Sequence, residues 1–336
     1  MTAEAGDTPL LEIRDLRIHY PLRQGWLDVV RRRPPTVVRA VDGVSLVLRR
    51  GELVALVGES GCGKTTTALA ILGMVDVAGG EVRVAGQDVG KTKGRAMGRL
   101  RRKVQMVWQD PYESLDPRTR VRSVVGEPLA VHRHVCPRPE RPARVAAALV
   151  RAGLQPAEDY LERRPHELSG GQRQRVAIAA SLVVGPDLLV ADEPVSMLDV
   201  SVRSGILGLL DGLRHEGMGV LLITHDLATA AQVADRIAVM YLGRIVEEGP
   251  ARAVVTAPRH PYTRALLSVV PRRDPARRPP RQLLEGEAPD PVDVPAGCRF
   301  HPRCPAARPE CRATDPALHL PEGAADPDQR AACILV

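Results

Sequence analysis

An apolar run, a glycine-rich turn and a second apolar run follow one another in residues 55–72, ALVGESGCGKTTTALAIL. Residues 58–65 within this stretch match the pattern G-x-x-x-x-G-K-[ST], which joins a buried strand to a helix. The glycines let successive backbone N–H groups converge on phosphate oxygens, and the helix N-terminus adds a partial positive charge. A flexible glycine-rich turn is the alternative, but four constrained positions rarely match by chance. The stretch therefore predicts a nucleotide site.

A lysine stands in this turn although lysine is rare in the chain. Of the 47 basic residues only four are lysines, and one of them is Lys64. Its compact charge on a flexible stem can reach the β- and γ-phosphates, where a planar arginine would fit badly. Thr65 offers a hydroxyl to Mg²⁺, and Cys62 is interpreted as a small filler. The residues expected to bind the nucleotide here are Gly58, Glu59, Ser60, Gly61, Cys62, Gly63, Lys64, Thr65 and Thr66.

Strand-like and helix-like segments alternate along most of the chain. Residues 10–57 favour β structure, 65–74 favour a helix, and about 95–185 favour helices. Beyond them the segments DLLVADEP, VRSGILGLLDGLRHEG, GVLLITHD, LATAAQVADRI and AVMYLGRIVEEG predict strand, helix, strand, helix and hairpin. This order predicts an α/β fold with a parallel sheet and a helical insertion. After about residue 256 proline and arginine dominate and periodicity fades, so a domain boundary is expected there.

Two acids end an apolar strand in the stretch LLVADEP, residues 188–194. Such a strand lies beside the phosphate loop in nucleotide hydrolases, where its first acid holds Mg²⁺ and its second faces the γ-phosphate. We therefore assign Asp192 to Mg²⁺ and Glu193 to polarising the attacking water. A helix cap or a surface acid pair is the alternative interpretation.

A second anion-binding helix end is predicted in LSGGQRQR, residues 168–175, where a serine and two glycines open a helix. Here the sequence resembles the nucleotide-binding subunits of ABC transporters, whose signature motif is LSGGQ. The resemblance covers residues 9 to about 255 and implies a P-loop (RecA-like) ATPase core with an antiparallel β subdomain and a helical insertion at about 95–185. The signature residues, which cover the nucleotide held by a partner subunit, are Ser169, Gly170, Gly171 and Gln172.

The resemblance also implies roles for four residues outside these motifs. Tyr20 is the candidate for stacking on adenine, although a tyrosine beside a strand is more commonly a packing residue. Gln109 corresponds to the glutamine that reaches the metal and faces the membrane subunit. Asp199 corresponds to the aspartate that links two nucleotide sites across a dimer, and His225 to the histidine that contacts the γ-phosphate.

Two residues depart from the family pattern without removing a reacting group. Met197 stands where alanine is common, and Ala180 stands where a basic residue often follows the signature helix. We expect altered packing and retained hydrolysis. The family implies two ATP molecules sandwiched in a head-to-tail pair of subunits, so a lone chain is expected to hydrolyse ATP slowly, with ATP and Mg²⁺ as cofactors.

The chain of 336 residues is 44% apolar, has no apolar run of about 18 residues and does not open like a signal peptide. It is therefore expected in the cytosol. The net charge of +7 would suit nucleic acid or an anionic membrane, but the basic residues are spread along the chain and no nucleic acid partner is expected. A soluble ABC ATPase acting on ribosomes or DNA is disfavoured because the chain has one phosphate loop, one signature and no long coiled coil.

The segment 256–336 resembles the C-terminal extension of the oligopeptide/dipeptide branch of importers, through HPYTRALL and GCRFHPRCP. This resemblance implies two membrane-spanning permease subunits, a second ATPase subunit (a paralogue or a second copy) and an extracytoplasmic substrate-binding protein. The chain would then lie on the cytoplasmic face of the cell membrane. A non-peptide solute such as nickel or glutathione, or export, remains an alternative because other subunits read the substrate.

Four of the six cysteines gather in the last 40 residues. The tight C-x₂₋₄-C pair typical of zinc sites is absent among them. Four thiolates on proline-rich loops can hold a [4Fe–4S] cluster, and some members of this branch carry one. Zinc and metal-free thiols are the alternatives. The candidate cluster ligands are Cys298, Cys304, Cys311 and Cys333.

Overall fold

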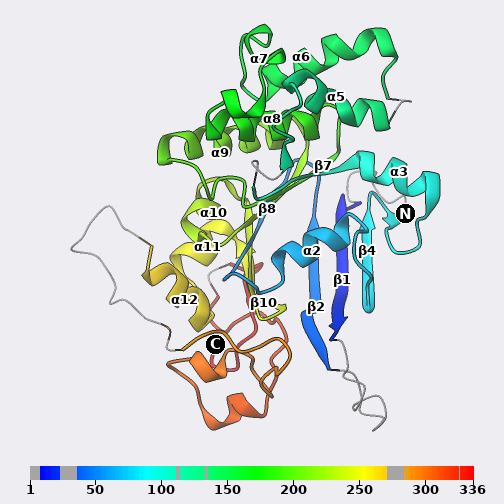
Figure 1. The fold of residues 1–336 in the computed structure, drawn as a ribbon. Coiled ribbons are helices and arrows are strands. Elements are labelled where there is room, and N and C mark those ends of the chain that lie inside the picture. Colours follow the sequence, from blue (N-terminus) through cyan, green and yellow to red (C-terminus); the bar gives the residue numbers. More distant parts are fainter. Residues whose placement is uncertain are drawn as a thin grey trace, which may run out of the picture. The chain divides into compact units, whose positions relative to one another are not determined.

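The computed structural model describes residues 8–22, 36–110, 114–132, 135–270, 284, 286–324 and 326–336. The chain divides into two compact units. Unit 1 takes its described residues from the ranges 1–11, 47–53 and 83–224, and unit 2 takes them from 12–46, 54–82 and 225–336. Each unit combines strands with helices (Figure 1). The predicted α/β fold with parallel strands is confirmed.

Unit 1 contains three neighbouring parallel strands. They are β6 (Val104–Val107), β7 (Leu188–Asp192) and β8 (Gly219–Thr224), with Val104 opposite Leu188 and Leu188 opposite Gly219. All residues of β7 and β8 are buried, which explains their continuous apolar sequences.

Strand β6 corrects one expectation, because it lies inside the stretch 95–185 that was interpreted as helical. It directly follows the arginine-rich helix α3 (Gly94–Lys103), and its four residues are too few to show a period of their own. Pairing with β7 therefore decides its conformation.

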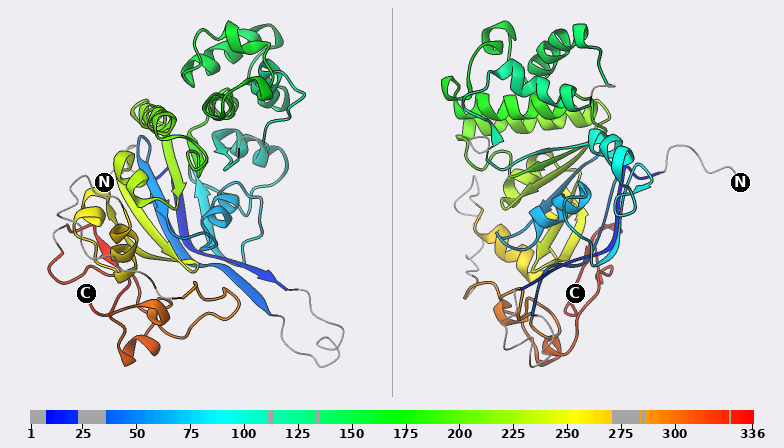
Figure 2. Two further views of the ribbon diagram at one scale, coloured as in Figure 1. Left: turned by 60° about the vertical axis from the view of Figure 1, so that its left-hand side comes forward. Right: turned by 45° about the vertical axis from the view of Figure 1, so that its right-hand side comes forward.

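The rest of the predicted helical stretch does form helices. Helix α8 packs against α5, α6 and α9, and these helices gather at one end of unit 1 (Figures 1 and 2). The Ser181 hydroxyl on α8 donates to the Met106 carbonyl at 3.1 Å, which fastens this helix to β6. The bounds are α5 Val121–Val131, α6 Arg141–Arg151, α7 Glu158–Leu161, α8 Gly170–Leu182 and α9 Val200–His215, with 3₁₀ turns at Arg138–Glu140 and Pro165–Glu167.

Unit 2 contains two groups of strands. One has the order β2-β1-β4, formed by β1 (Leu11–Pro21), β2 (Val37–Leu48) and β4 (Gly79–Val84). The last two residues of β4 fall within the range of unit 1, where they pair antiparallel with β5 (Gln87–Asp88). In the other, β3 pairs parallel with β9, and β9 pairs antiparallel with β10. The remaining bounds are β3 Leu53–Val57, β9 Arg236–Tyr241, β10 Arg244–Pro250, α2 Lys64–Ile71, α10 Leu227–Val233, α11 Ala251–Thr256 and α12 Pro261–Ser268.

The tail after residue 256 belongs to unit 2 and forms no compact unit of its own. Strand β11 (Arg330–Ala331) pairs antiparallel with β10, and 3₁₀ turns lie at His301–Arg303 and Pro309–Arg312. Figure 2 shows the tail beside the strands of unit 2. The expectation of lost periodicity was wrong for α12, which begins with a proline at its first position. A functional boundary at residues 255/256 stays a prediction.

Polar bonds fix α12 and the tail to β10. The buried Glu247 carboxylate accepts the backbone N–H groups of Arg259 and His260, each at 2.8 Å, and the Gln329 amide at 2.9 Å. His260 Nδ1 in turn accepts the Tyr262 N–H at 3.1 Å and caps α12. Because the ring nitrogen must be neutral to accept this bond, the cap requires an uncharged imidazole.

Burial, aided by the charge of Arg264, lowers the pKa of His260 to about 3. The unfolded chain therefore binds a proton between about pH 6.5 and about pH 3 that the folded chain does not, and stability falls as the pH falls through this window. We expect His260→Asn, which keeps a cap acceptor, to lose about 2 kcal/mol less unfolding free energy than the parent between pH 7 and pH 5. Denaturant titrations at the two pH values measure the difference. His215→Asn, at an exposed position, is the control, and identical pH slopes for the parent and His260→Asn would contradict the expectation.

No helix among the described residues has the length and apolar character needed to cross a bilayer.

Candidate functional site

The phosphate loop has the backbone shape that its glycines predict. Gly63 adopts φ 106° immediately before α2. A Cβ atom on Gly63 would lie 2.2 Å from the Ala40 carbonyl oxygen, and one on Gly58 would lie 2.2 Å from that of Met240. Any larger side chain at either position would push the loop off β2 or β9. The loop is therefore a cradle of backbone that is held closely by two strands.

Lys64 is buried to 5% exposure at the first position of α2. Its ammonium group donates to the carbonyl oxygens of Gly58 and Glu59, each at 2.8 Å, and so lies inside the curve of the loop. The side chain of Cys62 is buried, in agreement with its interpretation as a filler, and burial raises the pKa of its thiol. Thr65 is exposed at the same end of α2.

The sequence did not indicate two tail residues that contact this loop. The Glu59 N–H donates to the Tyr262 hydroxyl at 2.9 Å, and the Glu59 carboxylate forms an ion pair with Arg303 at 2.8 Å. Tyr262 and Arg303 stand in HPYTRALL and GCRFHPRCP, the two segments that carried the resemblance of the tail. More than 200 positions separate these two residues from the loop, so no local pattern could pair them with it. The only signal was their chemistry: a hydroxyl and a guanidinium that could bond to the loop.

Three of the predicted site residues lie together at the end of β7. Asp192 is its last residue and is 2% exposed. Glu193 follows with φ 46°, a left-handed conformation that is uncommon for a residue other than glycine, and its N–H donates to the Ile223 carbonyl at 2.9 Å. The Gln109 amide donates to the Glu193 carboxylate at 3.4 Å. Strain at a carboxylate of this kind is typical of functional sites.

The signature residues form the start of α8. The Ser169 hydroxyl accepts the Gln172 N–H at 3.3 Å, and the Gln172 side chain accepts the Ser169 N–H at 3.0 Å, which is a reciprocal capping box. A Cβ atom on Gly171 would lie 2.3 Å from the Val202 side chain, so glycine is needed where α8 meets α9. Asp199 precedes α9 and is exposed.

The other two residues with predicted roles are both accessible. Tyr20 lies near the end of β1 and is 39% exposed. His225 is exposed, and the following Asp226 accepts the Ala228 N–H at 2.9 Å and the Thr229 hydroxyl at 2.6 Å. Asp226 therefore caps α10 and fixes the turn that carries His225, a role the sequence did not indicate. Of the two departures from the family pattern, Met197 is 60% exposed and Ala180 is partly buried on α8.

The predicted ATP-site residues are divided between the two units. Unit 1 holds Gln109, Ser169, Gly170, Gly171, Gln172, Asp192, Glu193 and Asp199, and unit 2 holds Tyr20, His225 and the loop residues 58–66. Their individual roles stay predictions.

The residues present fit ATP and Mg²⁺ chemically. The backbone cradle with a buried ammonium group suits a polyphosphate. The Thr65 hydroxyl, the Asp192 carboxylate and the Gln109 amide are oxygen donors, which Mg²⁺ prefers. Mg²⁺ bound with ATP would supply Lewis-acid neutralisation of phosphate charge, and the assignment of these donors to one ion stays a prediction.

The four tail cysteines all belong to unit 2 and lie within residues 298–333. Burial raises the pKa values of Cys298, Cys304 and Cys333, and neighbouring cysteines of the group raise them further. The Cys298 N–H donates to the Cys311 carbonyl at 2.9 Å. Within the described part of the chain, however, no three or more His, Cys, Asp or Glu side chains are arranged to hold a metal ion. Cysteine thiols are suitable ligands for an iron–sulfur cluster, but the arrangement of these four side chains does not fit one.

Two sequence families match the chain. Residues 41–196 match the family described as ABC transporter. Residues 246–311 match the family described as the C-terminal region of oligopeptide/dipeptide transporters. The two matches cover the two parts of the chain whose motifs carried the resemblance.

Three relatives illustrate the similarity. The oligopeptide transport ATP-binding protein OppF of Salmonella typhimurium is 44% identical over 314 residues, which cover 92% of each chain. The dipeptide transport ATP-binding protein DppF of Escherichia coli is 43% identical and covers 92% of this chain and 91% of its own. The glutathione import ATP-binding protein GsiA of Pectobacterium atrosepticum is 47% identical over 87% of this chain and 46% of its own length.

Solved structures agree with the fold. A dimeric ATP-binding cassette in a post-hydrolysis state with ADP and Pi is 28% identical, with a TM-score of 0.62 over 72% of this chain and 99% of its own. A subunit of an ABC transporter complex from Clostridium perfringens is 27% identical, with a TM-score of 0.62 over 74% and 91%. The chain belongs to the ATP-binding subunits of the ABC transporter family. It is thus an ATPase whose hydrolysis of ATP drives transport across a membrane.

Proposed function

We propose that this chain is one of two ATPase subunits that power a peptide importer. Its similarity to the oligopeptide and dipeptide transport proteins supports this proposal, because the matched part includes the C-terminal region as well as the ATPase core. The chain would lie on the cytoplasmic face of the membrane. Its partners would be two membrane-spanning permeases, a second ATP-binding subunit and, indirectly, an extracytoplasmic substrate-binding protein.

In the proposed reaction each predicted ATP-site residue has the role that the family resemblance implies. Tyr20 stacks on adenine, and Lys64 and the backbone of the loop bind the phosphates. Glu193 polarises the attacking water, and His225 contacts the γ-phosphate. The contact between Gln109 and Glu193 supports a role for Gln109 in orienting the base. The signature of the partner subunit, through its own Ser169 equivalent, completes the nucleotide site, and Asp199 links the two sites.

Glutathione is the second candidate substrate, because a glutathione import protein is 47% identical over 87% of this chain. The chain spans only about half of that protein. Nickel import and export have no comparable support. Since the substrate is recognised by the permeases and the binding protein, the ATPase alone gives no contact with it.

The function is tested by isolating the chain with its partners. We expect a tagged chain, purified from detergent-solubilised membranes of its native host, to carry two multi-spanning proteins and a second ATPase. The assembled complex is then placed in proteoliposomes with its binding protein. Its ATPase rate is measured with short peptides, glutathione or Ni²⁺. Stimulation by peptides alone supports the proposal, and stimulation by glutathione alone replaces it.

Two other outcomes would contradict the transport proposal more deeply. Co-purification with ribosomal or DNA-repair proteins, and with no membrane protein, would contradict the proposal that the chain belongs to an importer. Substrate accumulation inside inverted vesicles, whose ATPase faces out, would establish export. In both cases the ATP chemistry would be unaffected.

We also propose that the four tail cysteines bind an iron–sulfur cluster. The presence of four cysteines in the last 40 residues supports this, although no described set of side chains is arranged for a metal, and we assign the cluster no step in the reaction. We expect protein purified without oxygen to contain about four iron and about four acid-labile sulfide per chain. Cys136→Ala is the control, because this cysteine lies outside the group, and its iron and sulfide contents should equal those of the parent. Zinc in place of iron, or neither metal, would end the proposal.

A further inference from the structure

The tail segment Cys298–Cys304, here called the arginine segment, provides a counter-charge to an acid in the phosphate loop. The Arg303 side chain is 9% exposed. Its Nη1 lies 2.8 Å from one Glu59 oxygen, and its Nη2 lies 3.3 Å from the other, so the contact is two-pronged. Such paired contacts between guanidinium and carboxylate are strong and geometrically specific.

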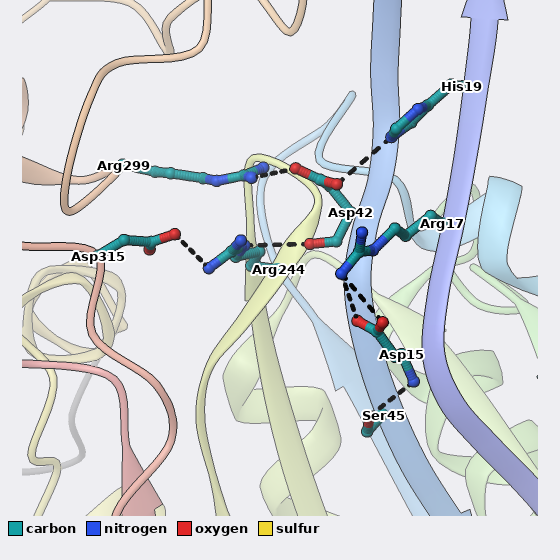
Figure 3. A network of polar contacts seen from close by, with 8 residues as sticks. All are labelled: Asp15, Arg17, His19, Asp42, Ser45, Arg244, Arg299 and Asp315. Atoms are coloured by element: carbon teal, nitrogen blue, oxygen red, sulfur yellow. Dashed lines mark hydrogen bonds and ion pairs between the residues drawn. The ribbon is translucent and has the colours of Figure 1, made fainter. Parts of the chain in front are cut away.

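The arginine segment is anchored separately from this ion pair. Arg299 donates to the Leu242 carbonyl at 2.7 Å and forms a short ion pair with Asp42 on β2 (Figure 3). Arg244 bonds the Asp42 carbonyl at 3.0 Å and pairs with Asp315 at 2.6 Å, which adds a second link from the tail to this network.

Aromatic packing at Phe300 also fixes the arginine segment. Phe300 is 1% exposed and meets Tyr241 edge to face with ring centroids 5.2 Å apart. It also packs on Tyr262, whose hydroxyl accepts the Glu59 N–H. Arg303 is therefore presented to Glu59 by a rigid support. Arg303 Nη1 also donates to the Tyr241 hydroxyl at 3.5 Å, and an arginine guanidinium stays charged in proteins.

An acid in this loop presents an electrostatic problem. Glu59 is the second residue of a loop that binds a polyphosphate, and its carboxylate is partly buried, with 31% of the side chain exposed. A carboxylate on the loop repels the negative charge of a phosphate that the loop binds, and the repulsion is stronger where water is excluded. An ATP-binding loop with this acid needs a cation that neutralises it.

We propose that Arg303 is this cation: a positioning residue that neutralises Glu59 and thereby maintains the affinity of the phosphate loop for ATP. The proposal rests on the ATP site described above. It gives the tail a part in nucleotide binding, in addition to any role of its cysteines.

The test is a double-mutant cycle on the purified full-length chain, with Mg-ATP binding measured calorimetrically at about 50 and about 300 mM salt. We expect Arg303→Met to raise the Kd for ATP about tenfold at low salt and less at high salt, because screening weakens repulsion. We expect Arg303→Met combined with Glu59→Gln to return the Kd to within about threefold of the parent. Arg303→Lys, which keeps the charge, should also stay within about threefold.

The rescue by Glu59→Gln separates a counter-charge from a structural bond, because the double variant lacks the ion pair too. Arg299→Met is the matched control: it removes a second buried arginine of the segment, and Glu59→Gln should not rescue its effects. An unchanged Kd for Arg303→Met, or a double variant as weak as Arg303→Met, would overturn the proposal. If Arg303→Met does not fold, Glu59→Gln alone decides it: a Kd equal to or below that of the parent supports the proposal, and a Kd raised tenfold overturns it. Weaker ATP binding by Lys64→Ala verifies the ATP site independently of Arg303.

Discussion

Glu193→Gln is expected to bind ATP about as tightly as the parent and to hydrolyse it about 10² to 10⁴ times more slowly, the range that a general base contributes. The amide has the shape of the carboxylate but cannot accept a proton from water. The strained backbone at Glu193 is unchanged by the substitution, so the fold should tolerate it. The measurements are ATP binding by calorimetry and phosphate release by the assembled transporter.

Glu216→Gln is the control, because Glu216 is an exposed acid that pairs with Arg151 on the surface of unit 1. It should hydrolyse ATP at the parent rate. If Glu193→Gln also turned over at that rate, the base would have to be another residue. A variant that bound no ATP would instead indicate that Glu193 contributes to the shape of the site.

Lys64→Ala is expected to weaken ATP binding itself, by about tenfold to a hundredfold. The variant loses a buried ammonium group, and charged hydrogen bonds of this kind contribute about 1.5–3 kcal/mol each. The Gly58 and Glu59 carbonyl oxygens would also lose their shared donor, and the loop would lose a contact that fixes its curve. Calorimetric titration with Mg-ATP measures the change.

Lys91→Ala is the matched control, since Lys91 is another of the chain's few lysines and is 83% exposed beside Asp88. Its Kd for ATP should equal that of the parent. If Lys64→Ala bound ATP with the same Kd as the parent, the assignment of residues 58–65 as the phosphate loop would be wrong. A lower melting temperature for Lys64→Ala without weaker binding would give the lysine a structural role only.

The phosphate loop and the start of the signature helix could be predicted because short stretches of sequence determine their conformations. The spacing of glycines required a tight turn, and the structure explains it by the close carbonyl oxygens of Ala40 and Met240. The serine and glutamine of the signature predicted a helix start, which the capping box confirms. In each case a bond or contact within a few residues determines the conformation.

The long-range parts could not be predicted from one sequence. Nothing near Arg303 indicates that its partner is Glu59, and nothing near Glu247 indicates a buried carboxylate that is satisfied by backbone and amide donors. Strand β6 was missed because its conformation depends on its neighbour β7. The cysteines were identified by their number and spacing and by the family resemblance, and none of these shows whether four thiols converge on one ion.

The pairing of β11 with β10 sets the order in which unit 2 can be completed during synthesis. Residues 330–331 are made roughly 270 positions after β3, which lies in the same group of strands. At about 5–20 residues per second, the ribosome needs on the order of half a minute to cover that distance. Once β10 (Arg244–Pro250) is made, its edge lacks a partner until residues 330–331 follow about 80 positions later, and exposed edges invite pairing with other chains. The ATP-binding loop is therefore among the first parts of the chain to be made, and its supporting tail is among the last.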